Sequence, residues 1–250
     1  MKAKYDKPCV VIPCLNEQRY ISTVLDDLAS QTVKPTWVFV ADAGSKDGTV
    51  DEIRKRQKRL NVEVVQGGLP AKGRNAGARA CPKDAIIFFL DADVSIDKRF
   101  IETAIREMKA RGLEAATCPN IPFYRSGEKG YKNALIRFSD RLIYISHNFS
   151  LRASRLFRFP LATGTCIIAT RAVFDKIKGF DETVKAFEDS DFVYNAFKAG
   201  KYGVLRKVRV LVSTRRFDKK GRFLFPLKII FYGFFLRMSK SQSQMEYFDD

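Results

Sequence analysis

The residues best suited to chemistry are two aspartates that follow a short apolar run. Residues 86–90 read Ile-Ile-Phe-Phe-Leu, and Asp91 and Asp93 come directly after them. Such a run indicates a strand buried on both faces, as in a parallel sheet. Side chains two residues apart lie on the same face of an extended chain, so these carboxylates would converge. A pair of this kind binds a divalent cation or keeps one member protonated. An Asp-containing turn at a strand end gives the same pattern.

A cation at this position would be Mg²⁺ or Mn²⁺. Both metals prefer oxygen ligands, and Mg²⁺ commonly takes one or two carboxylates and completes its shell with substrate phosphates. The chain carries 45 basic and 28 acidic residues, a net charge of +17. This excess predicts an anionic partner, which could be nucleotide phosphates, nucleic acid or an acidic membrane surface.

A second acidic cluster lies far along the chain. Glu188, Asp189 and Asp191 stand where a helical pattern begins that continues through Phe197. Acids at a helix N-terminus are favoured by the helix dipole, so the cluster could be a cap. It could also supply a general base.

The elements that would position these clusters alternate between strands and helices. Apolar runs predict strands over residues 9–13, 37–41, 61–65 and 86–90, and helical spacing occurs from 20, over 50–58 and over 74–80, with a turn at 67–70. This alternation predicts a doubly wound, mostly parallel sheet between helices. Ligands of such sheets bind beyond the carboxyl ends of the strands, where Pro13, Asp42 and Asp91 fall.

The second half of the chain is more varied. We expect helices over 100–111, from 173 and from 188, and strands over 115–121, 161–169 and within 202–212. Residues 127–158 combine dense apolar positions with five arginines. This pattern is typical of a helix that faces a membrane interface or the acceptor, and equally of a long helix packed on the domain.

Residues 223–236 form a strongly apolar segment with basic residues on both sides. The segment is too short to span a bilayer, which takes about 20 apolar residues. An anionic membrane surface suits it, as does a dimer contact or packing within the chain. We therefore divide the chain into residues 1–217 and a basic, apolar tail, 218–250.

Length and composition bound the remaining possibilities. A chain of 250 residues, 46% of them hydrophobic, is large enough for one substantial domain. The five cysteines are scattered without a CxxC pair and the N-terminus has no apolar leader, which fits a reducing cytosol. The only histidine is His147, so no mechanism that needs two histidines is possible.

Five segments in order along residues 8–217 resemble the family 2 glycosyltransferases of the GT-A fold. They are Val-Val-Ile-Pro-Cys-Leu-Asn-Glu (10–17), Asp-Ala-Gly-Ser-Lys-Asp-Gly-Thr (42–49), Gly-Arg-Asn-Ala-Gly (73–77), Phe-Leu-Asp-Ala-Asp (89–93), and Gly-Phe-Asp-Glu (179–182) leading to Glu-Asp-Ser-Asp (188–191). Each is weak alone, but five in the family's order are specific.

The resemblance implies a nucleotide-sugar site at the strand ends. It implies that the donor-binding residues are Pro13, Leu15, Glu17, Asp42, Lys72, Arg74, Asp91, Arg215 and Arg216. Asp93 would be the direct metal ligand, and Asp91 would hold the ribose or a water on the metal. The expected cofactor is Mg²⁺ or Mn²⁺, bridging the donor's diphosphate.

The resemblance also implies an acceptor base. Asp189 would take the proton of an acceptor hydroxyl while Glu188 orients the acceptor, and direct displacement would invert the anomeric centre. A lipid-phosphate acceptor would be ionised already and need no base. The sequence favours a uridine donor over guanosine or thymidine but names neither sugar nor acceptor.

Arg215-Arg216-Phe217 stands where processive relatives carry Gln-x-x-Arg-Trp. The missing Trp and Gln argue against processive synthesis, and the arginines would clamp the diphosphate or form a solvated surface strip.

We therefore expect a non-processive, metal-dependent transferase bound peripherally to the cytosolic face of the membrane, acting on a sugar or lipid-linked acceptor in cell-envelope polysaccharide or glycolipid synthesis. The alternatives are a sugar-phosphate nucleotidyltransferase, whose Gly-rich first loop is missing here, and a non-catalytic basic module. No nucleic-acid motif is visible, so no nucleic-acid partner is expected.

Overall fold

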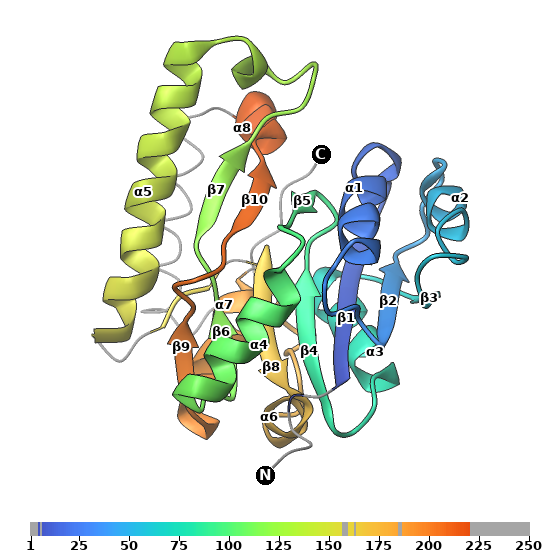
Figure 1. Cartoon of the computed structure of the whole chain (residues 1–250), viewed down its shortest axis with the longest axis vertical. Coiled ribbons are helices and arrows are strands. Elements are labelled where there is room, and N and C mark those ends of the chain that lie inside the picture. Colours follow the sequence, from blue (N-terminus) through green and yellow to red (C-terminus); the bar gives the residue numbers. More distant parts are fainter. Residues whose placement is uncertain (1–4, 6, 157–159, 163, 185–186, 221–250) are drawn as a thin grey trace.

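The computed structural model describes residues 5, 7–156, 160–162, 164–184 and 187–220. Strands form one large sheet and one small sheet, and helices cover both faces of the large one (Figure 1).

The first half of the chain is the predicted parallel sheet. β1 (Lys7–Cys14), β2 (Trp37–Asp42), β3 (Val62–Gln66) and β4 (Ala85–Leu90) lie in the order β3-β2-β1-β4, and all neighbours are parallel. Every residue of β4 is buried, as its continuous apolar run predicts. The register pairs Cys14 with Asp42, so these strand ends meet at one edge of the sheet.

Beyond β4 the sheet becomes mixed. β8 (Cys166–Thr170) pairs antiparallel with β4, and β6 (Ala115–Thr117) and β9 (Tyr202–Val204) follow it. The single strand expected over 115–121 is two strands, because the chain leaves β6 at Cys118-Pro119 and proline has no N–H for a ladder. The second piece, β7 (Asn120–Phe123), joins β5 (Val94–Ser95) and β10 (Val210–Ser213) in a small sheet ordered β5-β10-β7.

The helices divide between the two faces of the large sheet. α1 (Gln18–Ala29), α2 (Thr49–Arg54) and α4 (Phe100–Arg111) bury apolar side chains on one face. α3 (Pro70–Ala80), α6 (Arg171–Lys176) and α7 (Glu188–Ala199) do so on the other. α3 begins four residues earlier than we expected, since Pro70 occupies its first turn, where its missing N–H costs nothing.

The small sheet carries the last elements. α5 (Ala134–Leu156) runs along β7, and the short helices η2 (Lys129–Tyr131) and α8 (Arg215–Lys220) lie near its N-terminal half (Figure 1). The ring of Phe217 in α8 is 5.9 Å from that of Tyr144 in α5. α8 runs across position 217, where we placed the domain boundary. The apolar segment 223–236 lies outside the described residues. Within the described part of the chain, no helix has the length and apolar character needed to cross a bilayer.

Candidate active site

The loops after β1 and β2 are bound to each other above the strand ends. Asn16 has a left-handed backbone (φ 54°), and its side-chain oxygen accepts the N–H of Lys46 at 2.9 Å. Its own N–H donates to the Ser45 hydroxyl at 2.9 Å. Asn tolerates this conformation better than most residues, so the Asn of the first motif is explained by the turn it makes.

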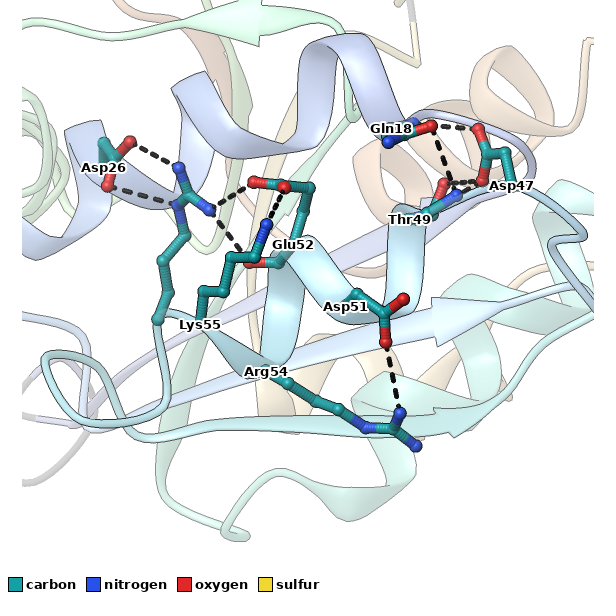
Figure 2. A network of polar contacts seen from close by, with 10 residues as sticks. Gln18, Asp26, Asp47, Thr49, Asp51, Glu52, Arg54 and Lys55 are labelled. Carbon is teal, nitrogen blue, oxygen red and sulfur yellow. Dashed lines mark hydrogen bonds and ion pairs between the residues drawn. The ribbon is translucent and has the colours of Figure 1, made fainter.

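The same two loops are joined again at the start of α1. The carboxylate of Asp47 accepts the backbone N–H groups of Thr49 and Gln18, at 3.0 and 3.1 Å (Figure 2). The Gln18 side chain in turn accepts the N–H of Gly48 at 3.2 Å. The first two motifs therefore form one hydrogen-bonded unit at the strand ends.

Asp42, which we expected to bind base or ribose, is engaged by its own loop. One carboxylate oxygen accepts the N–H groups of Gly44 and Ser45, at 3.1 and 3.0 Å, and the other accepts the Ser45 hydroxyl. The Cys14 thiol lies 3.5 Å from Asp42, and burial together with this carboxylate raises the thiol's pKa. Asp42 thus shapes the loop at the strand end in the structure without ligand.

Asp91 lies in an ion-pair cluster with Arg74 and Glu188, here named the Arg74 cluster. One guanidinium nitrogen of Arg74 donates to Glu188 at 2.7 Å, and another donates to Asp91 at 3.0 Å. Arg74 is only 3% exposed and lies 5.5 Å from the ring centre of Phe180. A single buried arginine therefore connects the end of β4 with the start of α7, which are 97 residues apart in sequence (188 − 91).

Asp189 follows Glu188 in the first turn of α7. Burial and the neighbouring Glu188 carboxylate together raise its pKa to about 7, against the opposing effect of the Arg74 guanidinium. Among carboxylates, one that titrates near neutrality is suited to accept a proton at working pH. The acidic cluster that could have been a simple cap thus contains a group with the properties of a general base.

The backbone directly before these acids is strained. Phe187, which precedes α7, has φ of 63°, a left-handed value that is rare for a bulky residue. Such outliers cost about 1–3 kcal/mol and persist where the surroundings hold them. Phe187 therefore marks the point where the loop ends and α7 begins with Glu188 and Asp189.

Asp93 belongs to a second ion-pair cluster, here named the Arg215 cluster. The guanidinium of Arg215 donates to Asp93 at 3.1–3.2 Å and to Glu17. It also lies 4.1 Å from the ring centre of Tyr20. The second carboxylate oxygen of Glu17 is buried without a hydrogen-bond partner, and burial raises the pKa of Glu17 against the opposing effect of Arg215.

The chain turns at residues 92–93, so Asp91 and Asp93 do not continue as an extended strand as we expected. Each faces its own arginine instead. Within the described residues, no group of three or more His, Cys, Asp or Glu could hold a metal by itself. The carboxylates of Asp91 and Asp93 and the Glu17 oxygen without a partner are ligands of the kind that a hard cation prefers. Such a cation would need phosphates to complete its shell, and Arg215 would have to release its ion pairs.

The other predicted donor residues line the same edge but are less enclosed. Pro13 is partly buried, Leu15 is half exposed, and Lys72 and Arg216 are exposed. Sequence reasoning missed the roles of Tyr20 and Phe180, the aromatic rings beside the two arginines. The position of Tyr20 three residues after Glu17, one helical turn away, was a usable signal.

Asn75 explains another of the sequence motifs. Its amide nitrogen donates to the Phe180 carbonyl and its oxygen accepts the Phe180 N–H, both at 2.8 Å. The adjacent α3 residues Arg74 and Asn75 thus hold Glu188 and Phe180, which come from the second half of the chain.

This arrangement can be set beside known proteins. Residues 9–178 match the model of the family described as "Glycosyl transferase family 2". The chain belongs to this family. The family and the GT-A fold that we predicted from the motifs are therefore confirmed.

Individual relatives of this family 2 chain are distant. The poly(ribitol-phosphate) beta-N-acetylglucosaminyltransferase TarS of Staphylococcus aureus (strain Mu50 / ATCC 700699) is 24% identical over 224 residues, 83% of this chain and 35% of TarS. The validoxylamine A glucosyltransferase of Streptomyces hygroscopicus subsp. limoneus is 33% identical over 102 residues, 38% of this chain and 22% of that enzyme. The chain spans about a third or less of the length of these relatives.

Solved structures share the fold. S. aureus TarS 1–349 in complex with UDP-GlcNAc has a TM-score of 0.62 at 22% identity, covering 84% of this chain and 59% of that one. The mannosyltransferase PcManGT of Pyrobaculum calidifontis, in complex with GDP-Man and Mn²⁺, has a TM-score of 0.61 at 20% identity, covering 82% and 56%.

Proposed function

We propose that this chain transfers a sugar from a nucleotide-sugar donor to an acceptor hydroxyl, with inversion at the anomeric carbon. The observation that carries the proposal is the Arg74 cluster. It places a carboxylate with a pKa of about 7, Asp189, next to an arginine that holds Asp91 at the nucleotide end of the sheet. The donor-side carboxylate Asp91 and the proposed acceptor base Asp189 would therefore act beside the same arginine.

In the proposed reaction, Asp189 accepts the proton of the acceptor hydroxyl. At the same time the oxygen of that hydroxyl forms a bond to the anomeric carbon. The bond from that carbon to the donor's diphosphate breaks on the opposite face, which inverts the centre. Glu188 is held by Arg74 and helps to orient the acceptor. An acceptor that is already ionised, such as a lipid phosphate, would not need Asp189 as a base.

The donor would lie across the ends of β1, β2 and β4. Pro13, Leu15 and Asp42 would contact the nucleoside, and Lys72 and Arg216 would contact the phosphates. Arg215 would exchange a carboxylate for the diphosphate. Asp93 and Asp91 would hold Mg²⁺ or Mn²⁺, which when bound offsets the charge of the leaving diphosphate. A uridine donor is supported by TarS structures in complex with UDP and UDP-GlcNAc.

We also place the reaction at the inner face of the membrane, with the chain bound peripherally to anionic lipid. The net charge of +17 and the apolar, basic segment 223–236 support this location. An acceptor carried on a lipid, as in cell-envelope polysaccharide or glycolipid synthesis, would be met there.

The test of the chemistry is Asp189→Asn in the full chain. We expect sugar transfer to fall about 10³-fold, since a positioned base typically contributes 10²–10⁴. Donor affinity, measured by calorimetry with a panel of nucleotide sugars and Mn²⁺, should change less than about twofold because Asp189 faces the acceptor. Asp191→Asn is the matched control, because Asp191 lies in the same turn and pairs with Asn195 at 3.0 Å. Full transfer by Asp189→Asn to a hydroxyl acceptor would refute the assignment.

A further inference from the structure

The outer face of α5 carries a continuous row of exposed apolar side chains, here named the apolar stripe. Its members are 52–77% exposed and follow a spacing of three and four residues: Leu135, Phe138, Leu142, Ile145 and Phe149. This spacing places all five on one side of a helix. A row of five large exposed apolar residues is a larger patch than a protein surface usually leaves open, and such patches mark interaction sites.

The opposite face of α5 is fixed, so the helix cannot turn the stripe inward. Tyr144 and Leu151 are buried against the domain. Asn148 exchanges two hydrogen bonds with the backbone of Asn120 in β7, at 2.7 and 2.9 Å. Asp140 is fully buried and accepts the Tyr124 hydroxyl at 3.2 Å. The stripe is therefore a stable feature of the surface of α5, the helix that runs along the small sheet (Figure 1).

The charge beside the stripe is of one sign. Arg141 lies three residues from Phe138 and four from Ile145, Arg152 lies three from Phe149, and both arginines are exposed, as is Arg137. The only acid of α5 is Asp140, which is buried. The partner of this face must therefore accept apolar side chains and supply negative charge next to them.

Two partners made of this chain fail that requirement. A second copy would bring the same arginines against each other. The tail from 221 to 250 carries four basic residues, Arg222, Lys228, Arg237 and Lys240, against three acids at its very end, Glu246, Asp249 and Asp250, so it is basic overall and its apolar run 223–236 has only bases next to it. Neither would neutralise the flank of α5, and like charges at an apolar seam oppose pairing.

We infer that the apolar stripe of α5 and its arginines dock on an anionic lipid bilayer, with α5 lying in the plane of the surface. Aromatic and aliphatic side chains on one face with basic residues beside them are typical of interfacial helices. Each basic residue near such a surface adds to the attraction for anionic lipid.

The inference deepens the proposed membrane location by naming the face that meets the lipid. Phe217 of α8 packs on Tyr144, so the last described element lies against the inner face of α5, opposite the apolar stripe. α8 also begins with Arg215 of the Arg215 cluster. Docking through α5 would therefore hold the donor end of the site close to the bilayer.

The experiment is vesicle flotation of the full chain, with phosphatidylcholine vesicles that contain or lack phosphatidylglycerol. The test variant carries Phe138→Ser, Ile145→Ser and Phe149→Ser. We expect its partitioning onto the anionic vesicles to fall on the order of a hundredfold. Because the three side chains are exposed, its melting temperature should equal that of the wild type. The control carries Val33→Ser, Val64→Ser and Leu69→Ser, exposed apolar residues elsewhere, and should float like the wild type.

A second variant, Arg141→Gln with Arg152→Gln, should weaken flotation by about tenfold and reduce its dependence on salt. Light scattering of the same proteins tests whether a second copy of the chain covers the apolar stripe instead. Wild-type dimers that the serine variant dissociates, or capture of an acidic protein with unchanged flotation, would overturn the inference.

Failure of this inference can be told apart from failure of the proposed membrane location. If Ile230→Ser with Phe234→Ser abolishes flotation while the α5 variant floats normally, the tail binds lipid and the stripe does not. If the wild type floats on neither vesicle, both are refuted. Nucleotide-sugar hydrolysis without acceptor should be the same in the wild type and the α5 variant, so the chemistry is judged separately.

Discussion

The two aspartates of the Asp91-Ala92-Asp93 segment lie in two similar clusters with different surroundings. Each aspartate is held by one arginine, which also holds one glutamate from a distant element. The Arg74 side chain is 4% exposed and lies on a long helix in the core, whereas the Arg215 side chain is 21% exposed and begins the short α8. The first cluster is part of the packed interior, and the second lies nearer to solvent.

This difference gives the two carboxylates different roles. Asp91 is paired with a buried arginine that also holds Glu188, so this ion pair is the harder of the two to replace. Asp93 and Glu17 share an arginine at the surface, and one Glu17 oxygen has no partner. A cation that enters with the donor can replace the guanidinium at the second cluster more easily than at the first.

The largest expected effect separates the clusters by stability. Arg74→Met should lower the free energy of unfolding by about 3–5 kcal/mol, because it leaves Asp91 and Glu188 buried without their cation. Arg215→Met should cost about 1–2 kcal/mol, since the Arg215 side chain is 21% exposed and water can take its place beside Asp93 and Glu17. Urea unfolding checks both values.

Magnesium sharpens this test. A ligand that binds only the native state raises its stability, so Mg²⁺ should restore most of the loss in Arg215→Met and little of that in Arg74→Met. Arg106→Met, which removes an exposed pair with Glu102, is the control and should cost less than about 0.5 kcal/mol. Equal losses and equal rescue in the two cluster variants would remove the distinction between them.

The next largest effect is the pH dependence that Asp189, beside Arg74, gives to the rate of transfer and to stability. With a hydroxyl acceptor, transfer should rise about tenfold per pH unit below pH 7 and level off above it, as Asp189 loses its proton. Stability should move in the opposite direction. The pKa of Asp189 is raised in the folded state, so between about pH 4 and pH 7 the native chain holds a proton that the unfolded chain has lost. The free energy of unfolding therefore falls as pH rises through this window.

Asp189→Asn provides the control, because it should show neither trend. Its stability relative to the wild type should increase from pH 4 to pH 7 and stay constant above. A rate profile with its midpoint near pH 4 would show that burial does not raise the pKa of Asp189 in solution.

Much of the nucleotide half could be predicted from the sequence because its signals are local. The continuous apolar run 86–90 and the strand-helix alternation of residues 7–90 are confirmed, and their polar strand ends meet at one edge. Periodicity and turn chemistry depend on neighbouring residues, and both are visible without the fold.

The ion pairs were not predictable in the same way. Arg74 was expected to bind the donor, and its ion pair with Glu188, 114 residues later, was not foreseen. Arg215 was expected to clamp a diphosphate or lie on the surface, and it lies between Glu17 and Asp93. Long-range pairing depends on the mixed second half of the sheet, where β8 runs antiparallel and Pro119 divides an expected strand. No spacing within a short window specifies such contacts.

The smallest expected effect is on metal affinity, and it tests the second cluster directly. If Arg215 competes with a cation for Asp93, then Arg215→Met should bind Mn²⁺ more tightly than the wild type in the absence of donor, by about three- to tenfold. Calorimetry or the paramagnetic resonance of free Mn²⁺ measures this without any turnover. Asp93→Asn should lose the site in either background, and Arg106→Met should leave the affinity unchanged. Weaker Mn²⁺ binding by Arg215→Met would instead mean that the guanidinium supports the site, so that cation and arginine act together on the diphosphate.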